Sequence, residues 1–288
     1  MSLCIRLLRS LHFPLKRTHR YYEPRHKDKI IKFVIAQLPT VLIMSANSQI
    51  YEGKAKILYT TDEEEIFLAY FKDDATAFNA QKRGSIVGKG EINCQISSVL
   101  FQQLEALGIR THFIDSPTPN QMRVKAVKIL PLEVVVRNIA AGSLCLQTGL
   151  SLGTVLQPPL VEFYYKNDAL GDPLLTRDRL LLLELARTEQ IEEIKLLALQ
   201  INEFLSVFFR DCGITLVDFK LEFGVDSQQQ ILLADEISPD TCRFWNSADT
   251  DPNSRVMDKD RFRRDLGDVE QAYQQVLERV LTKVNSKK

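Results

Sequence analysis

The most regular pattern in the sequence is a strict alternation of apolar and polar residues from Val217 to Phe223. Because successive side chains of a strand point to opposite faces, this alternation predicts a β-strand with one apolar and one charged face. The charged face carries Asp218, Lys220 and Glu222. A polar segment follows, and the next apolar run begins at Ile231 and ends in Asp235-Glu236. The two runs together predict a β-hairpin.

The register of this hairpin determines which charged groups meet. If the residue numbers of cross-strand partners add up to about 455 to 457, Asp235 lies within side-chain reach of Lys220 and Glu222. With Asp218, three carboxylates and one ammonium group then converge on one sheet surface. The second strand is apolar on both faces, and carboxylates that enter a buried place need a partner or a cation. Oxygen ligands suit Mg²⁺ or Mn²⁺, and Mg²⁺ usually arrives with phosphates. The hairpin therefore indicates phosphate handling, and the alternative is an ordinary surface sheet with a charged outer face.

Two further patterns indicate anion binding. Lys54 and Lys56 lie two residues apart next to a glycine and could lie over nucleotide phosphates, although no GxxxxGK[ST] loop is present. Arg137 follows the buried-looking strand 132–136, and Ser143 begins a short helix. Together they would supply a bidentate cation and the donors of a helix N-terminus. The simpler interpretations are solvated surface lysines and a helix cap beside a surface arginine.

Hydrophobic periodicity along the rest of the chain indicates a mixed protein without internal repeats. A period of 3.6 residues predicts helices, and short apolar runs between turn residues predict strands. Helices are expected at 92–107, in two parts within 177–211 and at 269–284, and strands near 51–59, 66–71, 111–114, 123–129, 132–136 and 158–166.

Composition restricts the classes of function. The 288 residues have room for one large domain or two ordinary ones, and a formal net charge of zero gives no bias toward nucleic acid. His112 is the only histidine after residue 43, which excludes a catalytic triad and a multi-histidine zinc site there. The five cysteines are scattered without a CxxC pair, which indicates a reducing compartment. No apolar run reaches the roughly 18 residues that a membrane span needs.

The first 43 residues differ from the rest, because they contain nine lysines or arginines against only Glu23 and Asp28. An Arg-rich, acid-poor start is typical of an organelle transit peptide, and the apolar stretch from Phe33 to Met44 also allows a signal peptide. The interpretation that we favour takes Met44 as the natural start and the upstream residues as a basic extension that is disordered or not native. A nucleic-acid-binding arm has no supporting aromatic or repeat pattern.

Several long motifs occur together in the chain. They are Tyr51-Glu52-Gly53-Lys54-Ala55-Lys56, Pro131-Leu132-Glu133-Val134-Val135-Val136-Arg137-Asn138 with Ala140-Ala141-Gly142-Ser143, Lys166-Asn167-Asp168 with Asp172-Pro173, Val217-Asp218-Phe219-Lys220-Leu221-Glu222-Phe223-Gly224, Asp235-Glu236-Ile237-Ser238-Pro239-Asp240, Arg243, and Asp258-Lys259-Asp260-Arg261-Phe262. On these motifs the chain resembles the SAICAR synthetase family of purine biosynthesis, the phosphoribosylaminoimidazole-succinocarboxamide synthases. The resemblance runs from about Tyr51 to the last helix and does not cover residues 1–43.

The resemblance implies an α+β fold in two lobes, with ATP in the cleft between them, akin to protein kinases and ATP-grasp enzymes. A β-rich N-terminal ATP-binding lobe would span residues 44–131, and a larger mixed domain for substrate and metal would span residues 132–288. The implied activity is an ATP-dependent ligation. It joins the carboxylate of 5-amino-1-(5-phosphoribosyl)imidazole-4-carboxylate (CAIR) to the amine of L-aspartate and gives SAICAR, ADP and phosphate through an acyl phosphate. ATP and Mg²⁺ are the expected cofactors.

Within that frame, roles can be assigned to individual residues. Four lysines would neutralise ATP phosphates: Lys54, Lys56, Lys166 and Lys220. Glu222 and Asp235 would hold Mg²⁺ that bridges these phosphates, which also makes Glu222 part of the nucleotide site. The ribonucleotide would be bound chiefly at its 5′-phosphate by Arg137, Ser143 and Arg243, and at its ribose or base by Asp240. Lys259 and Arg263 would clamp a substrate carboxylate or phosphate. Lys220 and Asp218 are the expected catalytic residues, with Asp218 either orienting Lys220 or helping to deprotonate the aspartate amine.

Two other classes of protein remain open at this point. A kinase would share the lobes, lysines and acidic hairpin but needs an HRD-type catalytic loop, which the sequence lacks. A nucleotide-binding or nucleic-acid-binding module would leave the arginines without a common small phosphate ligand. The expected partners are therefore the small molecules CAIR and L-aspartate, without nucleic acid or membrane. A homo-oligomer stays open, and the cytoplasm is the expected compartment.

Overall fold

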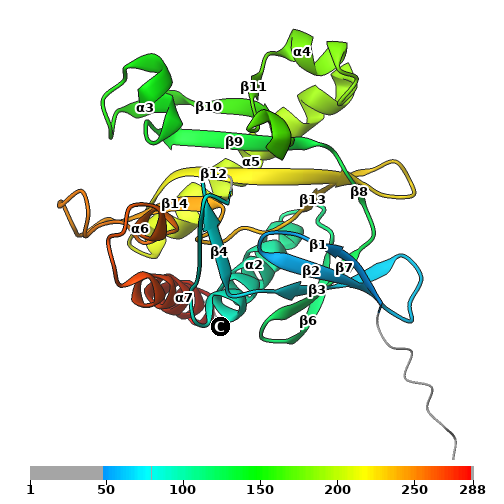
Figure 1. Ribbon diagram of the computed structural model, residues 1–288, viewed down its shortest axis with the longest axis horizontal. Helices are drawn as coiled ribbons and strands as arrows, with labels where there is room; N and C mark the ends of the chain where they lie inside the picture. Colours follow the sequence, from blue (N-terminus) through cyan, green and yellow to red (C-terminus); the bar gives the residue numbers. More distant parts are fainter. Residues whose placement is uncertain (1–47, 79, 287–288) are drawn as a thin grey trace, which may run out of the picture. The chain divides into compact units, whose positions relative to one another are not determined.

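The computed structural model describes residues 48–78 and 80–286. Two large antiparallel sheets and six α-helices make up most of this described part. Figure 1 shows how they are arranged. The predicted α+β class is confirmed. The prediction about residues 1–43 lies outside the described residues.

The first sheet has five strands in the order β1-β2-β3-β7-β6. Their bounds are β1 Gln49–Glu52, β2 Lys56–Thr60, β3 Ile66–Phe71, β7 Gln121–Lys125 and β6 Phe113–Thr118. Helix α2, Lys89–Ala106, packs against β3, β6 and β7, and the C-terminal helix α7, Val269–Asn285, packs against α2. A small hairpin of β4, Asp74–Ala77, and β5, Lys82–Ser85, stands apart from both large sheets.

The second sheet is built around one long central strand, β12, Ile214–Val225. Four strands pair with it: β9 Leu132–Ile139, β13 Ile231–Ala234, β14 Cys242–Asn246 and β8 Lys128–Ile129. Outside β9 lie β10 Val155–Tyr165 and β11 Leu174–Leu175. The remaining helices are α3 Ser143–Thr148, α4 Arg177–Leu182, α5 Thr188–Asp211 and α6 Asp260–Arg263, with the 3₁₀ turn η2 at Asp168–Leu170.

The hairpin predicted from the alternating pattern is present in the predicted register. Glu222 lies opposite Ala234, and Gly224 lies opposite Leu232. All four residues of β13 are buried, as expected for a strand that is apolar on both faces. This register brings Asp235, which directly follows β13, next to the charged face of β12.

Three strand boundaries differ from the predictions. β6 continues through Pro117 to Thr118, beyond the predicted end at residue 114, because β6 is the outer strand of its sheet and a missing N–H costs little at an edge. For the same reason β10 begins at Val155, ahead of its prolines, where its outer edge is not paired with β11. Arg137 lies within β9 and not at its end, because β9 continues to Ile139 between β10 and β12.

Helix α5 packs against the second sheet and contributes buried side chains to its core. A buried apolar stripe of α5 faces β9, β10 and β12, and the ring of Phe209 lies 4.5 Å, centroid to centroid, from that of Phe244 on β14. The predicted break near Thr188 is confirmed as the start of α5. The predicted lobe boundary between residues 131 and 132 coincides with the start of β9. However, β8 lies before this boundary and pairs with β12 of the second sheet, so the boundary stays a prediction.

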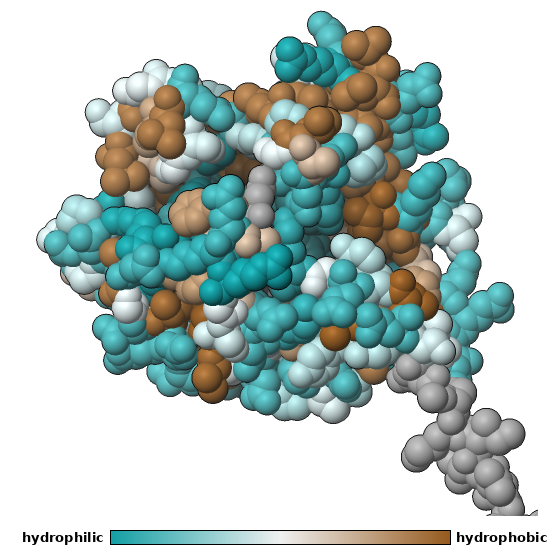
Figure 2. Space-filling view, viewed as in Figure 1, coloured by the Kyte–Doolittle hydropathy of each residue, from teal (hydrophilic) through white to brown (hydrophobic). Residues whose placement is uncertain are grey.

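The surface on the side shown in Figure 2 is hollowed near its centre, with hydrophilic side chains around the hollow. Hydrophobic side chains gather instead over α3 and α4, where Leu146 and Leu182 are 89% and 80% exposed. No helix in the described part of the chain is both long and apolar enough to cross a membrane.

Candidate active site

A cavity of about 1250 Å³ receives side chains from β2, β4, β9, β12 and the segments after β13 and β14. Most of the predicted site residues line it, among them Lys54, Lys56, Lys259 and Arg263. Ser143 is the exception and contacts the cavity residue Arg137. The structure therefore brings the sequence-predicted residues together.

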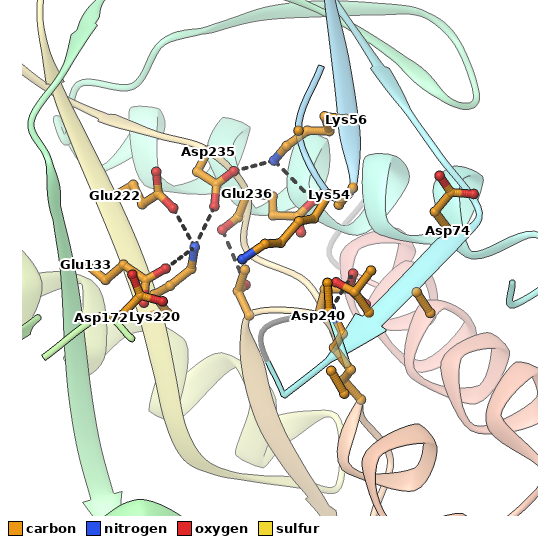
Figure 3. A pocket seen from close by; sticks show the side chains of 18 of the residues that line it. Lys54, Lys56, Asp74, Glu133, Asp172, Lys220, Glu222, Asp235, Glu236 and Asp240 are labelled. Carbon is orange, nitrogen blue, oxygen red and sulfur yellow. Dashed lines mark hydrogen bonds and ion pairs between the residues drawn. The ribbon is translucent and has the colours of Figure 1, made fainter. Parts of the chain in front are cut away.

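Lys220 is the centre of a cluster of carboxylates (Figure 3). Its Nζ lies 2.5 Å from Glu222 Oε1, 3.2 Å from Asp235 Oδ2 and 3.3 Å from Glu133 Oε1. Lys56 forms a second ion pair with Asp235, and Lys166 forms one with Glu222. Because Lys220 pairs with Val135 and Glu133 lies two residues from Val135, Glu133 and Lys220 are on the same face of the sheet. The hairpin register adds Asp235. Alternating ammonium and carboxylate groups thus occupy one end of the cavity.

Electrostatics keep this cluster charged. Burial acts to lower the pKa of Lys220, but the charges of Glu222 and Asp235 outweigh burial and raise that pKa well above its usual value. Burial likewise acts to raise the pKa of Asp235, but Lys56 and Lys220 hold it well below the usual range. At neutral pH Lys56 and Lys220 remain cations, because nearby carboxylates raise the pKa of both, and a cation is the state needed to bind phosphate oxygens.

The carboxylates predicted to hold Mg²⁺ fit that ion. Glu222 and Asp235 both face the same ammonium nitrogen and offer only oxygen ligands, which a hard cation prefers. Within residues 48–78 and 80–286, no group of three or more His, Cys, Asp or Glu side chains is arranged to hold a metal ion. The pair therefore suits a cation that takes its remaining ligands from phosphates and water.

The other end of the cavity contains a row of alternating arginines and carboxylates. Arg137 Nη1 lies 3.1 Å from Asp218 Oδ2, and Arg243 Nη1 lies 2.8 Å from the same oxygen and 3.0 Å from Oδ1. The row continues through Asp260, whose oxygens lie 2.9 Å from Arg243 Nε and 2.5 Å from Arg263 Nη1. Two adjacent strands place Arg137 and Arg243 opposite Asp218 in the ladder. Fixed guanidinium groups of this kind suit a phosphate or carboxylate ligand.

Asp218 therefore has partners other than the one that was expected. Asp218 accepts hydrogen bonds from Arg137 and Arg243, and Lys220 donates instead to Glu222 and Asp235. Lys220 points toward β13, because Glu222 and Asp235 attract it more closely. In this geometry Asp218 holds two arginines, and the hypothesis that it orients Lys220 or helps to deprotonate the aspartate amine stays a prediction.

The predicted anion pocket at Arg137 and Ser143 depends on a glycine. Arg137 Nη2 donates to Ser143 Oγ at 3.2 Å, directly after Gly142. Gly142 has φ of 55° and ψ of −131°, a conformation that side chains strongly disfavour. A Cβ atom there would lie 2.6 Å from Nη2 of Arg243, so the position also lets this guanidinium approach the backbone.

We expect Gly142→Ala to raise the KM for the ligand of the arginine pocket about tenfold or more, because the added methyl group displaces Arg243 and strains the backbone. Steady-state kinetics checks this. Gly149→Ala is the matched control, because Gly149 also has positive φ but a Cβ there meets nothing within 4 Å. Equal KM values in the two variants would contradict the steric explanation.

The remaining predicted residues lie at the rim and behind the row. Lys54 Nζ lies 2.6 Å from Asp168 Oδ1, and both side chains are largely exposed. Lys259 Nζ lies 3.4 Å from Asp240 Oδ2, and both of these line the cavity. Lys54 is thus free to move toward a ligand, whereas Asp240 is held in place.

Five carboxylates that form ion pairs with predicted site residues were not themselves predicted as site residues: Glu133, Glu162, Asp168, Glu236 and Asp260. Period two in β9 could have found Glu133, which shares a strand face with Arg137. Glu236 lies 3.3 Å from Lys56, and burial raises its pKa. Asp260 was part of a quoted motif, but nothing local indicated its arginine partners.

His112, the lone histidine of this part of the chain, is buried behind the lysine cluster. Its ring packs edge-on against Phe101 at 5.5 Å, and its Nε2 has no hydrogen-bond partner among the described residues. Burial, together with the charge of Lys56, lowers its pKa from 6.5 to about 3. The folded protein therefore keeps this imidazole neutral at pH values where the unfolded chain would protonate it.

We expect this histidine to make the protein less stable as pH falls from about 6.5 toward 3, because only the unfolded state gains the proton. Between pH 7 and pH 5 its contribution to the free energy of unfolding falls by about 2 kcal/mol. His112→Phe should remove that part of the pH dependence. Urea unfolding of both proteins at the two pH values checks it, and parallel losses of stability would refute the assignment.

The fold and the cavity together define a class of protein. It is an α+β protein with lysines and paired carboxylates at one end of the cavity and fixed arginines at the other. This arrangement is expected of a nucleotide-dependent enzyme with a second anionic substrate. A family model described as SAICAR synthetase matches residues 49–280. The chain belongs to the SAICAR synthetase family.

Individual relatives agree with this membership. A phosphoribosylaminoimidazole-succinocarboxamide synthase of a Nostoc species is 80% identical over 244 residues, which are 85% of this chain and all of the relative. The crystal structure of the synthase from Ehrlichia chaffeensis has a TM-score of 0.77 and 44% identity, covering 81% of this chain and 98% of that one. A SAICAR synthetase (type 2) in complex with ADP has a TM-score of 0.77 and 46% identity, covering 81% of this chain and 97% of that one.

Proposed function

We propose that this protein is an ATP-dependent carbon–nitrogen ligase that joins the carboxylate of CAIR to the amine of L-aspartate and produces SAICAR, ADP and phosphate. The observation that carries the proposal is the single cavity in which the lysine cluster around Glu222 and Asp235 faces the Arg137–Asp218–Arg243 row. One end suits the phosphates of a nucleotide, and the other suits a phosphorylated acceptor. Family membership supports the choice of substrates.

The first step activates a poor electrophile. An oxygen of the CAIR carboxylate attacks the γ-phosphorus of ATP, the bond to the β,γ-bridging oxygen breaks, and ADP leaves. Lys220, Lys56 and Lys166 stabilise the charge that develops on the phosphate oxygens, with Lys54 closing from the rim. Glu222 and Asp235 would hold Mg²⁺, which would supply further neutralisation of the phosphates.

The second step forms the amide. The neutral amine of aspartate attacks the carbonyl carbon of the acyl phosphate, the carbon–oxygen bond to the phosphate breaks, and phosphate leaves while the nitrogen loses a proton. Arg137, Ser143 and Arg243 hold the ribonucleotide during both steps, and Lys259 and Arg263 bind a carboxylate or phosphate nearby. A neutral His112 buried outside the cavity cannot be the base, so a carboxylate or the substrate itself takes the proton.

The test is ADP release by the full chain with ATP, Mg²⁺ and CAIR, measured with and without L-aspartate, together with mass analysis of the product. Aspartate-dependent release with a succinocarboxamide product is the expected result. Release without aspartate and with a phosphorylated product would show a kinase instead. Omission of Mg²⁺ should abolish turnover, and full activity with a chelator present would remove Glu222 and Asp235 from metal binding.

We also propose that the protein acts in the cytoplasm on small molecules alone. The four cysteines of the described part, Cys94, Cys145, Cys212 and Cys242, are all free thiols, as a reducing compartment predicts. Fractionation of cells that express the tagged full chain checks the location. Recovery in an organelle fraction would favour the transit-peptide interpretation of residues 1–43.

A further inference from the structure

Asp240 is the centre of a buried polar cluster beside the arginine row. Its Oδ1 accepts a hydrogen bond from the Tyr273 hydroxyl at 2.8 Å. Its Oδ2 accepts hydrogen bonds from Lys89 Nζ at 3.1 Å and from Lys259 Nζ at 3.4 Å. Both carboxylate oxygens are therefore fixed, from three separate parts of the chain.

The four members of this cluster do not have the same access to a ligand. Asp240 and Lys259 line the cavity, whereas Lys89 and Tyr273 do not. Lys89 is 1% exposed in the first turn of α2, and Tyr273 is fully buried in α7. Lys89 and Tyr273 therefore do not contact a ligand in the cavity directly, and both form hydrogen bonds with the cavity residue Asp240.

The charges of the cluster make this support strong. Burial acts to raise the pKa of Asp240, but Lys259 and Lys89 hold it well below its usual value, so Asp240 is ionised. Burial raises the pKa of Tyr273, so its hydroxyl keeps the proton that it donates. Hydrogen bonds to charged groups are among the stronger ones in proteins.

The two supports also come from helices that pack against each other, α2 and α7. Neither helix otherwise supplies a side chain to the cavity. Lysines are rarely buried without a partner. The hydroxyl of a buried tyrosine usually forms a hydrogen bond, and many different acceptors would satisfy it. Here both side chains meet one carboxylate, which places Asp240 and Lys259 relative to the row that ends at Arg263.

We propose that Tyr273 and Lys89 are positioning residues that orient Asp240 and, through it, Lys259 for the ribonucleotide substrate. This inference rests on the proposed function, because it assigns the cluster to binding of CAIR and not of ATP. The nucleotide phosphates are assigned to the lysine cluster at the other end of the cavity.

The test compares Tyr273→Phe and Lys89→Met with the unchanged protein, and the KM values for CAIR, L-aspartate and ATP are measured separately. Tyr273→Phe removes one hydroxyl and keeps the buried ring. Val276→Ala, on the same helix and also buried, is the control for a purely structural effect.

We expect Tyr273→Phe to raise the KM for CAIR about fivefold to tenfold and Lys89→Met to raise it further, while the KM for ATP stays within twofold of the unchanged protein. Val276→Ala should lower the melting temperature without changing the KM for CAIR. An unchanged KM for CAIR in Tyr273→Phe, or a rise only in the KM for L-aspartate or ATP, would overturn the inference. If the unchanged protein shows no aspartate-dependent turnover, the proposed function itself has failed.

Discussion

Lys220→Met should lower kcat/KM for the ligation about 1000-fold, the order of loss seen when one preorganised charge-stabilising group is removed from an active site. Lys220 faces Glu222, Asp235 and Glu133 at distances of 2.5 to 3.3 Å. Without its ammonium group these carboxylates would repel each other and the incoming phosphates. The loss should appear mainly in kcat, because the charge on the transferred phosphoryl group is redistributed in the transition state.

Steady-state kinetics and thermal unfolding of the same preparation check this expectation. Lys283→Met is a matched control, because Lys283 also forms an ion pair, 2.7 Å from Asp211 Oδ2, but at the ends of α7 and α5 and not in the cavity. The control should retain the activity of the unchanged protein. A Lys220→Met enzyme within tenfold of it would show that Lys220 has no direct part in phosphoryl transfer.

Arg243→Gln should raise the KM for CAIR about 100-fold, because a charged hydrogen-bond donor is worth about 1.5 to 3 kcal/mol and glutamine cannot replace the guanidinium fork. Arg243 lies between Asp218 and Asp260, so its loss also leaves two carboxylates facing the substrate phosphate. The KM for ATP should change little, since the lysine cluster remains intact.

Arg279→Gln is the control for this second expectation. Arg279 Nη1 donates to the Gly213 carbonyl at 3.0 Å and to Asn246 Oδ1 at 3.3 Å, at the far ends of β12 and β14. This variant tests whether weakening the same strands is enough to change binding. Equal rises in the KM for CAIR and for ATP in Arg243→Gln would indicate a general loss of structure and would contradict a specific role.

The sequence alone predicted the hairpin and its charged cluster well, because both follow from local rules. An alternation of period two determines which side chains share a strand face, and a short turn restricts the register. The sequence alone could therefore predict that Lys220, Glu222 and Asp235 lie close together. A local pattern, two lysines two residues apart next to a glycine, was also enough to predict Lys54 and Lys56 as site residues.

The arginine row could not be predicted in the same way. Asp218 meets Arg137 and Arg243 because β12 pairs with β9 and with β14, and pairing between strands far apart in the sequence leaves no local signal. The resemblance to a family indicated that these residues belong to one site, but not that Asp218 joins the two arginines. Tyr273 gave no signal either, since a tyrosine on the apolar face of an amphipathic helix is usually part of the core.

The central strand β12 also fixes the distance between the two groups of charged side chains in the site. Asp218 and Glu222 stand on the same face four residues apart, which at a rise of about 3.3 Å per residue is roughly 13 Å. Since strands pair with β12 along this stretch, the distance between the proposed acceptor pocket and the proposed nucleotide end is set by the backbone and not by side-chain rotamers. Inserting a single residue between Asp218 and Glu222 would move the side chains at one end of the site to the opposite face of the sheet, toward the core. The spacing can therefore change only in steps of two residues.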